Sequence, residues 1–172
     1  MKKNILGIVT AFIVFAYTST CSAVILAEDV ALGGIHIRMP IEEVFALCGE
    51  PTRVESDSRI YYGDNDEMLV TFAFKGGTKR IVSSVLLRSN NGMTTPSGIS
   101  VGTKETDVIQ IHGEPDEEEM PRPKFYERKV KWYGTEFDYT LWYYRADFRG
   151  EVLRFGIKDG EVVFIECAKH VR

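Results

Sequence analysis

A short phrase occurs twice in this chain at a fixed spacing, and it constrains the fold more than any other feature. The first copy runs from Gly34-Ile35 to the triplet Gly49-Glu50-Pro51, and the second from Gly98-Ile99 to Gly113-Glu114-Pro115. The offset is 64 residues at both ends, from 34 to 98 and from 49 to 113. A Tyr-rich, β-branched run follows each copy. This periodicity predicts a tandem repeat of one unit, a helix followed by a sheet.

The stretch inside each copy has the features of a short helix. In the first copy Pro40 suits a first helical position, and two glutamates follow in the first turn, where the helix dipole favours them. Gly49 and the proline after it end the helix, which we place at about residues 40–48. The second copy uses other residues for the same structure, with Thr103 as the predicted N-cap and Gly113 as the stop.

Alternating apolar residues and turn signals after each helix predict antiparallel strands. In the first half the predicted strands are residues 59–63, 68–75 and 81–87. In the second half a charged insertion with two prolines comes first, and the predicted strands are residues 129–133, 138–144, 151–157 and 161–167. The predicted fold class is therefore α+β, with two tandem units over residues 24–92 and 93–172. Each unit is a short helix followed by an antiparallel β-meander.

The first 23 residues have the order of a secretory signal peptide. Lys2 and Lys3 precede an uncharged apolar run that is too short to span a membrane, and small residues follow as far as Ala23. We expect cleavage there, or alternatively after Ala27, and export to the periplasm or the cell exterior. Cys21 offers another outcome, because a lipid attached to it would anchor the protein. Membrane contact is expected only in that case.

Charge argues against nucleic acid as a partner. The formal net charge is −4, and removal of residues 1–23 takes away two lysines and no acid, which gives −6. An acidic chain without a basic run binds nucleic acid or an anionic membrane surface poorly. The expected partner is an envelope protein or a secreted protein.

Signals for catalysis and for metal binding are weak. His36, His112 and His170 do not have metal-ligand spacing, and neither a zinc motif nor a Gly-rich phosphate loop is present. An acidic run at residues 116–119 suits a solvated loop, with weak divalent-cation binding as the alternative. We predict no enzyme activity, no metal and no cofactor. The competing hypothesis is a small hydrolase-type enzyme with Cys48 or His112 in a cleft.

Two cysteines, Cys48 and Cys167, remain after the predicted cleavage. An even number in an exported chain permits one disulfide, which would tie the two repeats together across most of the mature chain. The alternative is a pair of buried reduced thiols that pack as small apolar groups.

Aromatic residues are concentrated in the second half. Residues 125–148 contain ten of them, and ring alternation along the strand at 138–144 places Tyr139 and Tyr143 on one face and Trp142 and Tyr144 on the other. One face must cover the helix, and the other would carry large rings toward a partner. The predicted partner-binding residues are Trp132, Tyr133, Trp142 and Tyr144. The alternative is that both faces are buried.

The residues Ile99-Ser100-Val101-Gly102, Val108 and Gly113-Glu114-Pro115 resemble the small α+β repeat of the SmpA/OmlA (BamE-like) outer-membrane lipoprotein family. The first copy departs from this pattern at Arg38, where the second has glycine. Two such units in tandem resemble the secreted β-lactamase inhibitor protein fold, in which paired sheets form one concave surface. The resemblance implies an exported, non-catalytic protein that binds other proteins. It implies no site residues, because the matched positions are caps and core.

The predicted function is an exported, non-enzymatic protein-binding module of the cell envelope that engages its partner through an aromatic sheet face. A secreted enzyme inhibitor is the alternative within the same class. Partner capture from envelope extract would separate the two.

Overall fold

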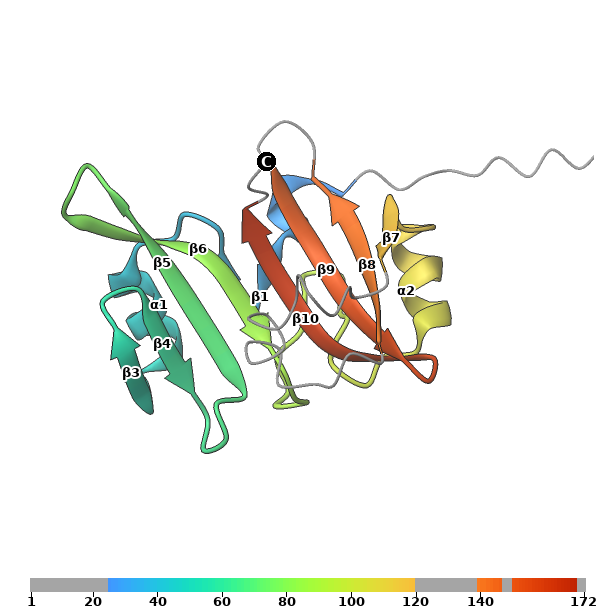
Figure 1. Cartoon of the computed structure of the whole chain (residues 1–172), viewed down its shortest axis with the longest axis horizontal. Helices are drawn as coiled ribbons and strands as arrows, with labels where there is room; N and C mark the ends of the chain where they lie inside the picture. Colours follow the sequence, from blue (N-terminus) through green and yellow to red (C-terminus); the bar gives the residue numbers. More distant parts are fainter. Residues whose placement is uncertain (1–24, 120–138, 147–149, 170–172) are drawn as a thin grey trace, which may run out of the picture.

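The computed structural model describes residues 25–119, 139–146 and 150–169 (Figure 1). The predicted signal peptide at residues 1–23, the predicted strand at 129–133, and Trp132 and Tyr133 with it, lie outside the described residues.

Most of the described chain forms one antiparallel sheet of eight strands, in the order β3-β4-β5-β6-β10-β9-β8-β7. Its strands are β3 (Arg53–Ser56), β4 (Arg59–Tyr62), β5 (Met68–Lys75), β6 (Lys79–Leu87), β7 (Glu117–Glu119), β8 (Thr140–Arg145), β9 (Glu151–Lys158) and β10 (Glu161–Lys169). A short turn of 3-10 helix, η1 (Ala27–Asp29), precedes a small two-stranded sheet of β1 (Ala31–Leu32) and β2 (Ile35–His36). The two helices, α1 (Ile41–Cys48) and α2 (Glu105–His112), have eight residues each.

The predicted fold class is wrong. The chain does not form two tandem helix-plus-meander units, because its strands join into one continuous sheet and the fold is mostly β. The seam is the pairing of β6 with β10, which runs from Leu87 opposite Ile165 to Ser84 opposite Ala168. In separate units both strands would be open edges with unpaired backbone groups. Pairing them satisfies those groups and extends one core across the whole sheet.

Each helix ends at its predicted glycine. Gly49 and Gly113 both have positive φ, 76° and 75°, a conformation that glycine adopts at little cost. Each glycine carbonyl also accepts a hydrogen bond from a tyrosine in the sheet: Tyr62 of β4 at 3.2 Å for Gly49, and Tyr144 of β8 at 3.0 Å for Gly113. The helix starts differ slightly from prediction. Pro40 and Lys104 are the N-cap residues, so Thr103 is one residue too early.

Both helices cover the same face of the sheet. Val44 of α1 and Val108 of α2 belong to one buried cluster with sheet residues of both halves, such as Val70 and Phe155. The opposite face, which we call the outer face, has its own smaller buried cluster, formed by Tyr61, Leu69, Leu86, Tyr139, Leu141, Tyr143 and Phe164. In the part of the chain that the structure describes, no helix is long and apolar enough to cross a membrane.

The two predicted disulfide partners are free thiols. Cys48 is half-buried at the end of α1, and Cys167 is buried in β10. Burial raises the pKa of both thiols. The structure therefore corresponds to the alternative, two reduced cysteines packed against the main core.

Candidate functional site: a protein-binding surface on the outer face

One row of side chains crosses the outer face from β3, an edge strand, to β8. Strand register places neighbours in contact along the sequence Arg53, Tyr61, Leu69, Leu86, Glu166, Arg154 and Tyr143. The row carries a tyrosine and an arginine near each end and two leucines in the middle. Its two ends differ in exposure, and this difference decides which one a partner can reach.

The end of the row in the second half is buried. Arg154 donates a hydrogen bond to Glu166 at 2.7 Å, and both side chains are nearly inaccessible, at 11% and 4% exposed. The guanidinium also lies over the ring of Tyr143, 5.2 Å from its centroid. A buried charged pair of this kind favours one strand register over others, and a partner protein cannot contact it.

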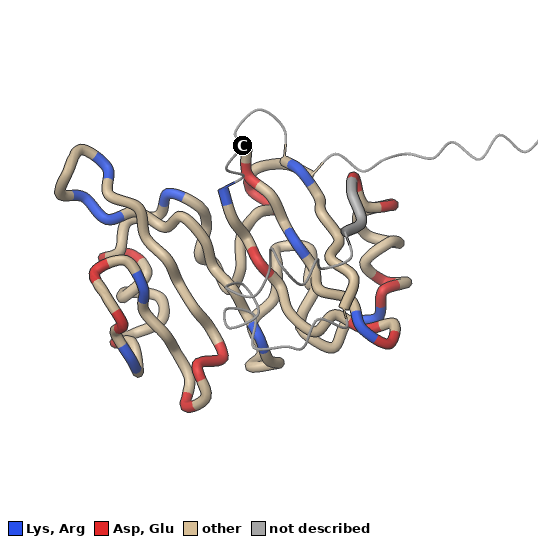
Figure 2. The backbone as a smooth tube through the Cα atoms, in the orientation of Figure 1, with Lys and Arg blue, Asp and Glu red and all other residues tan. Residues whose placement is uncertain are grey.

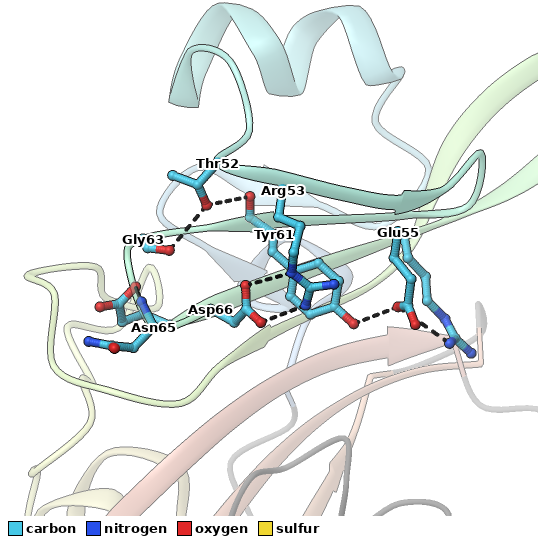
Figure 3. Close-up of polar contacts among 9 residues, drawn as sticks. Thr52, Arg53, Glu55, Tyr61, Gly63, Asn65 and Asp66 are labelled. Carbon is cyan, nitrogen blue, oxygen red and sulfur yellow. Dashed lines mark hydrogen bonds and ion pairs between the residues drawn. The ribbon is translucent and has the colours of Figure 1, made fainter.

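At the end in the first half, Arg53 is exposed although the Tyr61 ring beneath it is only 6% exposed, and the group is ordered by its own contacts (Figure 3). The Arg53 guanidinium lies 3.6 Å from the centroid of the Tyr61 ring. It also forms a two-point hydrogen bond with Asp66, with Nε to Oδ1 at 3.1 Å. Its side chain remains 46% exposed. Stacking and a bidentate carboxylate contact together hold a cation in a fixed orientation at the surface.

A second carboxylate completes this cluster. The Tyr61 hydroxyl donates to Glu55 at 2.7 Å, and Arg59 lies 3.6 Å from the same carboxylate. Thr52, at the start of the hairpin, donates to the carbonyls of Tyr61 and Gly63 at 3.1 Å each (Figure 3). We call the set of Arg53, Glu55, Arg59, Tyr61 and Asp66 the Arg53 surface. Acidic and basic residues alternate along this edge of the sheet (Figure 2).

The charges of the Arg53 surface stabilise one another. The hydrogen bond from Tyr61, followed by the nearby Arg59, lowers the pKa of Glu55 below its usual range. Burial, followed by the hydrogen bond to Glu55, raises the pKa of Tyr61. Asp66 raises the pKa of Arg53. At neutral pH the surface therefore presents an ionised carboxylate, a protonated tyrosine and a guanidinium in fixed positions.

The backbone at this edge is also open. β3 pairs with β4 on one side and has no strand partner on the other among the described residues. All four of its residues are exposed, including Val54 at 62%. An exposed edge strand is a ready template for an added strand from a partner.

The predicted site residues lie elsewhere. Trp142 and Tyr144 are buried, 6% and 2% exposed, in the cluster under the helices. The alternation predicted for β8 is confirmed, but its two faces were assigned the wrong way round: Tyr139 and Tyr143 face outward. Trp142 and Tyr144 therefore pack as core side chains, because Tyr144 caps α2 and lies edge-on to Phe155 at 5.8 Å. A partner cannot reach them in this structure.

The residues of the enzyme hypothesis are also accounted for by packing. His112 is buried next to the rings of Tyr144 and Phe155, and its Nε2 shares a hydrogen bond with the Ser97 hydroxyl at 3.0 Å. Burial lowers its pKa, with Asp29 acting weakly in the opposite direction. Within the described ranges, no group of three or more His, Cys, Asp or Glu side chains has the geometry to hold a metal ion.

The Arg53 surface has only a faint signal in the sequence. Arg53-Val54-Glu55-Ser56 lacks apolar alternation, so nothing marks it as a strand. Asp57-Ser58 before Arg59 is the one turn signal that would have suggested a hairpin. The bidentate contact from Arg53 to Asp66 spans 13 positions and depends on register alone.

No protein-family model matches the chain, and no curated protein matches it in sequence. Among solved structures, the chain is similar to YjgB, a DUF4309 family protein from Bacillus subtilis subsp. subtilis str. 168. The two share 18% sequence identity, the match covers 79% of this chain and 82% of that chain, and the TM-score is 0.48. A likeness at this level supports no inference about function. The resemblance to the SmpA/OmlA family stays a prediction.

Proposed function

We propose that this chain is an exported, non-enzymatic protein-binding module of the cell envelope, and that it contacts its partner through the Arg53 surface. The observation that carries the proposal is the Arg53 guanidinium, stacked on Tyr61, held by Asp66 and still 46% exposed. Arginine is enriched among the residues that dominate interface energetics, and here the buried Tyr61 ring holds Arg53 in position. A pre-ordered pair loses little side-chain entropy on binding.

The geometry favours a partner that offers hydrogen-bond acceptors. Arg53 has five N–H groups, and two of them are donated to Asp66. The guanidinium also interacts with Tyr61, and the Arg53 side chain remains 46% exposed, so a partner can reach the N–H groups that Asp66 does not occupy. A carboxylate or the carbonyls of an extended strand would accept hydrogen bonds from this guanidinium. A strand that pairs with the open side of β3 would bring its own carbonyls next to this guanidinium.

Export is supported by the sequence rather than by the described fold. Lys2 and Lys3, the apolar run after them and the small residues up to Ala23 are typical of a signal peptide. The acidic net charge of the remaining chain agrees with a protein partner and disfavours nucleic acid. We place the protein in the periplasm or outside the cell, with lipid attachment only if Cys21 is modified.

Site-specific photo-crosslinking in the producing cells tests the proposal. A benzophenone side chain at position 55 stands on the Arg53 surface, and one at Gln110, an exposed position of α2, serves as the control. We expect a discrete adduct from position 55 and none from position 110. Arg53→Ala should reduce the adduct by at least about tenfold, as expected for an interface hot spot. Arg80→Ala, on the β5–β6 hairpin of the same half, should leave it unchanged.

Equal adduct yields from positions 55 and 110, or an unaffected yield in Arg53→Ala, would show that the Arg53 surface is not the interface. Identification of the adduct by mass separates the two forms of the function. A captured hydrolase whose activity falls on binding would make the module an inhibitor. Any other envelope protein would make it a scaffold component.

A further inference from the structure

A pocket of about 440 Å³ lies far from the Arg53 surface, where the N-terminal segment meets the start of β9. Its lining includes Leu26, Glu28, Ala31, His36, Ile37 and Glu151. Ile25 forms a bridge with Ala146, and this bridge brings η1 and the β1–β2 hairpin to the end of the sheet where β9 begins (Figure 1). The volume is within the range of small-molecule sites.

The carboxylate of Glu151 is the unusual group in this pocket. The residue is 3% exposed, and Arg38 is its ion-pair partner among the described residues, with Nη2 3.8 Å from Oε1. Lys169 lies opposite Glu151 in the ladder between β9 and β10, and its side chain is exposed. A charge-assisted hydrogen bond between such groups is about 2.7–2.9 Å long, so this contact is an ion pair without a hydrogen bond. No donor among the described residues forms a hydrogen bond with the Glu151 side chain. A carboxylate with this environment can accept hydrogen bonds from a bound donor.

Arg38 reaches Glu151 from a backbone position that suits glycine. Its φ is 73°, in the left-handed region, and Gly102 at the equivalent point of the second half has φ 90°. The two make the same backbone contact, Arg38 N–H to the Val82 carbonyl at 2.8 Å and Gly102 N–H to the Val162 carbonyl at 2.7 Å. Arginine is strained in this conformation and glycine is not. What arginine adds is a cation beside Glu151, on a side chain that is 45% exposed.

The lining residues themselves favour a cation. Two carboxylates, Glu28 and Glu151, face the pocket with the single imidazole of His36, and neither lysine nor arginine is among its described lining residues. Leu26, Ala31 and Ile37 supply apolar walls next to the acidic end. A ligand with a cationic group and an apolar chain would match both the acidic end and the apolar walls of the pocket.

We propose that this pocket binds a short alkyl cation, an alkylammonium or alkylguanidinium group, with Glu151 as its counter-ion. The cation donates hydrogen bonds to the Glu151 carboxylate, which the distant Arg38 does not. The apolar chain lies against Leu26 and Ile37, and Glu28 adds a second carboxylate. Arg38 partly neutralises Glu151 in the free protein and competes with the ligand. This site is independent of the proposed partner surface.

Amide NMR titration of the purified protein tests this inference with three matched probes: n-butylammonium, n-butylguanidinium and neutral 1-butanol. We expect the two cations to shift the amide signals of Leu26, Ile37 and Glu151 saturably, and 1-butanol to shift them at least about tenfold less at equal concentration. Glu151→Gln should weaken cation binding by about tenfold or more, and Arg38→Gly should strengthen it several-fold. Glu50→Gln, an exposed carboxylate elsewhere, should change nothing.

Equal responses to 1-butanol, or loss of cation binding in Arg38→Gly, would overturn the proposal. If Glu151→Gln does not fold, Glu28→Gln provides the test, with an expected loss of a few-fold, and unchanged affinity there also overturns it. The cation has two sources, a free amine or a lysine side chain. Nα-acetyl-lysine amide distinguishes them: binding as tight as n-butylammonium indicates a peptide side chain, and weaker binding indicates a free amine.

Discussion

The paired tyrosine contacts allow a quantitative test of the fold. Tyr62 and Tyr144 each donate a hydrogen bond to the carbonyl of the glycine that ends a helix, at 3.2 Å and 3.0 Å. Burial raises the pKa of Tyr62 to about 12, so its hydroxyl is protonated at neutral pH and available as a donor. Substitution by phenylalanine removes the hydroxyl and keeps the ring, which isolates the hydrogen bond.

The two substitutions should differ in magnitude. A hydrogen bond of this kind contributes about 0.5–1.5 kcal/mol, with the higher value where water cannot replace the donor. Tyr144 is 2% exposed and Gly113 is half-buried, whereas Tyr62 is 8% exposed and Gly49 is exposed. We therefore expect Tyr144→Phe to lower the free energy of unfolding by about 1–1.5 kcal/mol and Tyr62→Phe by about 0.5 kcal/mol.

The double variant tests whether the two halves respond independently. β4 and β8 are five strand spacings apart in the sheet, roughly 24 Å at about 4.8 Å per spacing. At this separation the effects should add to within about 0.5 kcal/mol. Urea denaturation followed by circular dichroism measures all three variants, with an unchanged slope as the control for compactness. A Tyr62→Phe effect larger than that of Tyr144→Phe, or no effect in either, would refute the reasoning.

Three further predictions follow from buried groups. Without reductant, the intact mass should correspond to free thiols, and a maleimide should label Cys48 faster than Cys167 because only Cys48 is accessible; a protein two hydrogens lighter contradicts this. Glu166→Gln should lower the free energy of unfolding by roughly 3 kcal/mol, because it leaves Arg154 buried opposite a neutral amide, and the Glu166→Leu, Arg154→Met double variant should recover much of that loss. A double variant no more stable than Glu166→Gln would argue against this account. Burial lowers the pKa of His112 below its ordinary value of 6.5, so the unfolded chain takes up the proton first and stability falls as pH drops below that value. His112→Gln should reduce the loss in urea midpoint between about pH 7.5 and about pH 5.5, and an equal loss would contradict the assignment.

Local structure was predictable where single residues dictate it. Gly49 and Gly113 end their helices as expected, and Met68–Lys75 forms a strand with the predicted bounds. These features depend on turn chemistry and on alternation within a few residues. The tyrosine caps were harder to see, because Tyr62 follows its glycine by 13 positions and Tyr144 by 31. The insertion in the second half hides the equivalence of the two.

Long-range pairing was not predictable from the same signals. Alternation in β8 correctly separates its side chains into two faces, but it does not say which face packs against the helix. An exposed Trp142 was therefore compatible with the sequence. A pocket such as that of Glu151 depends on a bridge between Ile25 and Ala146, residues without any distinguishing local pattern. The candidate surfaces therefore lie where the sequence is least informative, in register and in contacts between distant segments.

The pairing of β6 with β10 has a consequence for how the protein folds. Among the described strands, every other neighbouring pair follows in chain order, and apart from β7 and β8 each of these pairs is separated by a short connection. The β6–β10 ladder can form only after β10 is available, because Leu86 pairs with Glu166 across almost half the chain. Such a contact forms late in folding. Until it forms, the nine-residue strand β6 has an unpaired edge that can pair with another chain. The C-terminal strand is thus the closing step of folding, and a chain truncated before it should aggregate through β6.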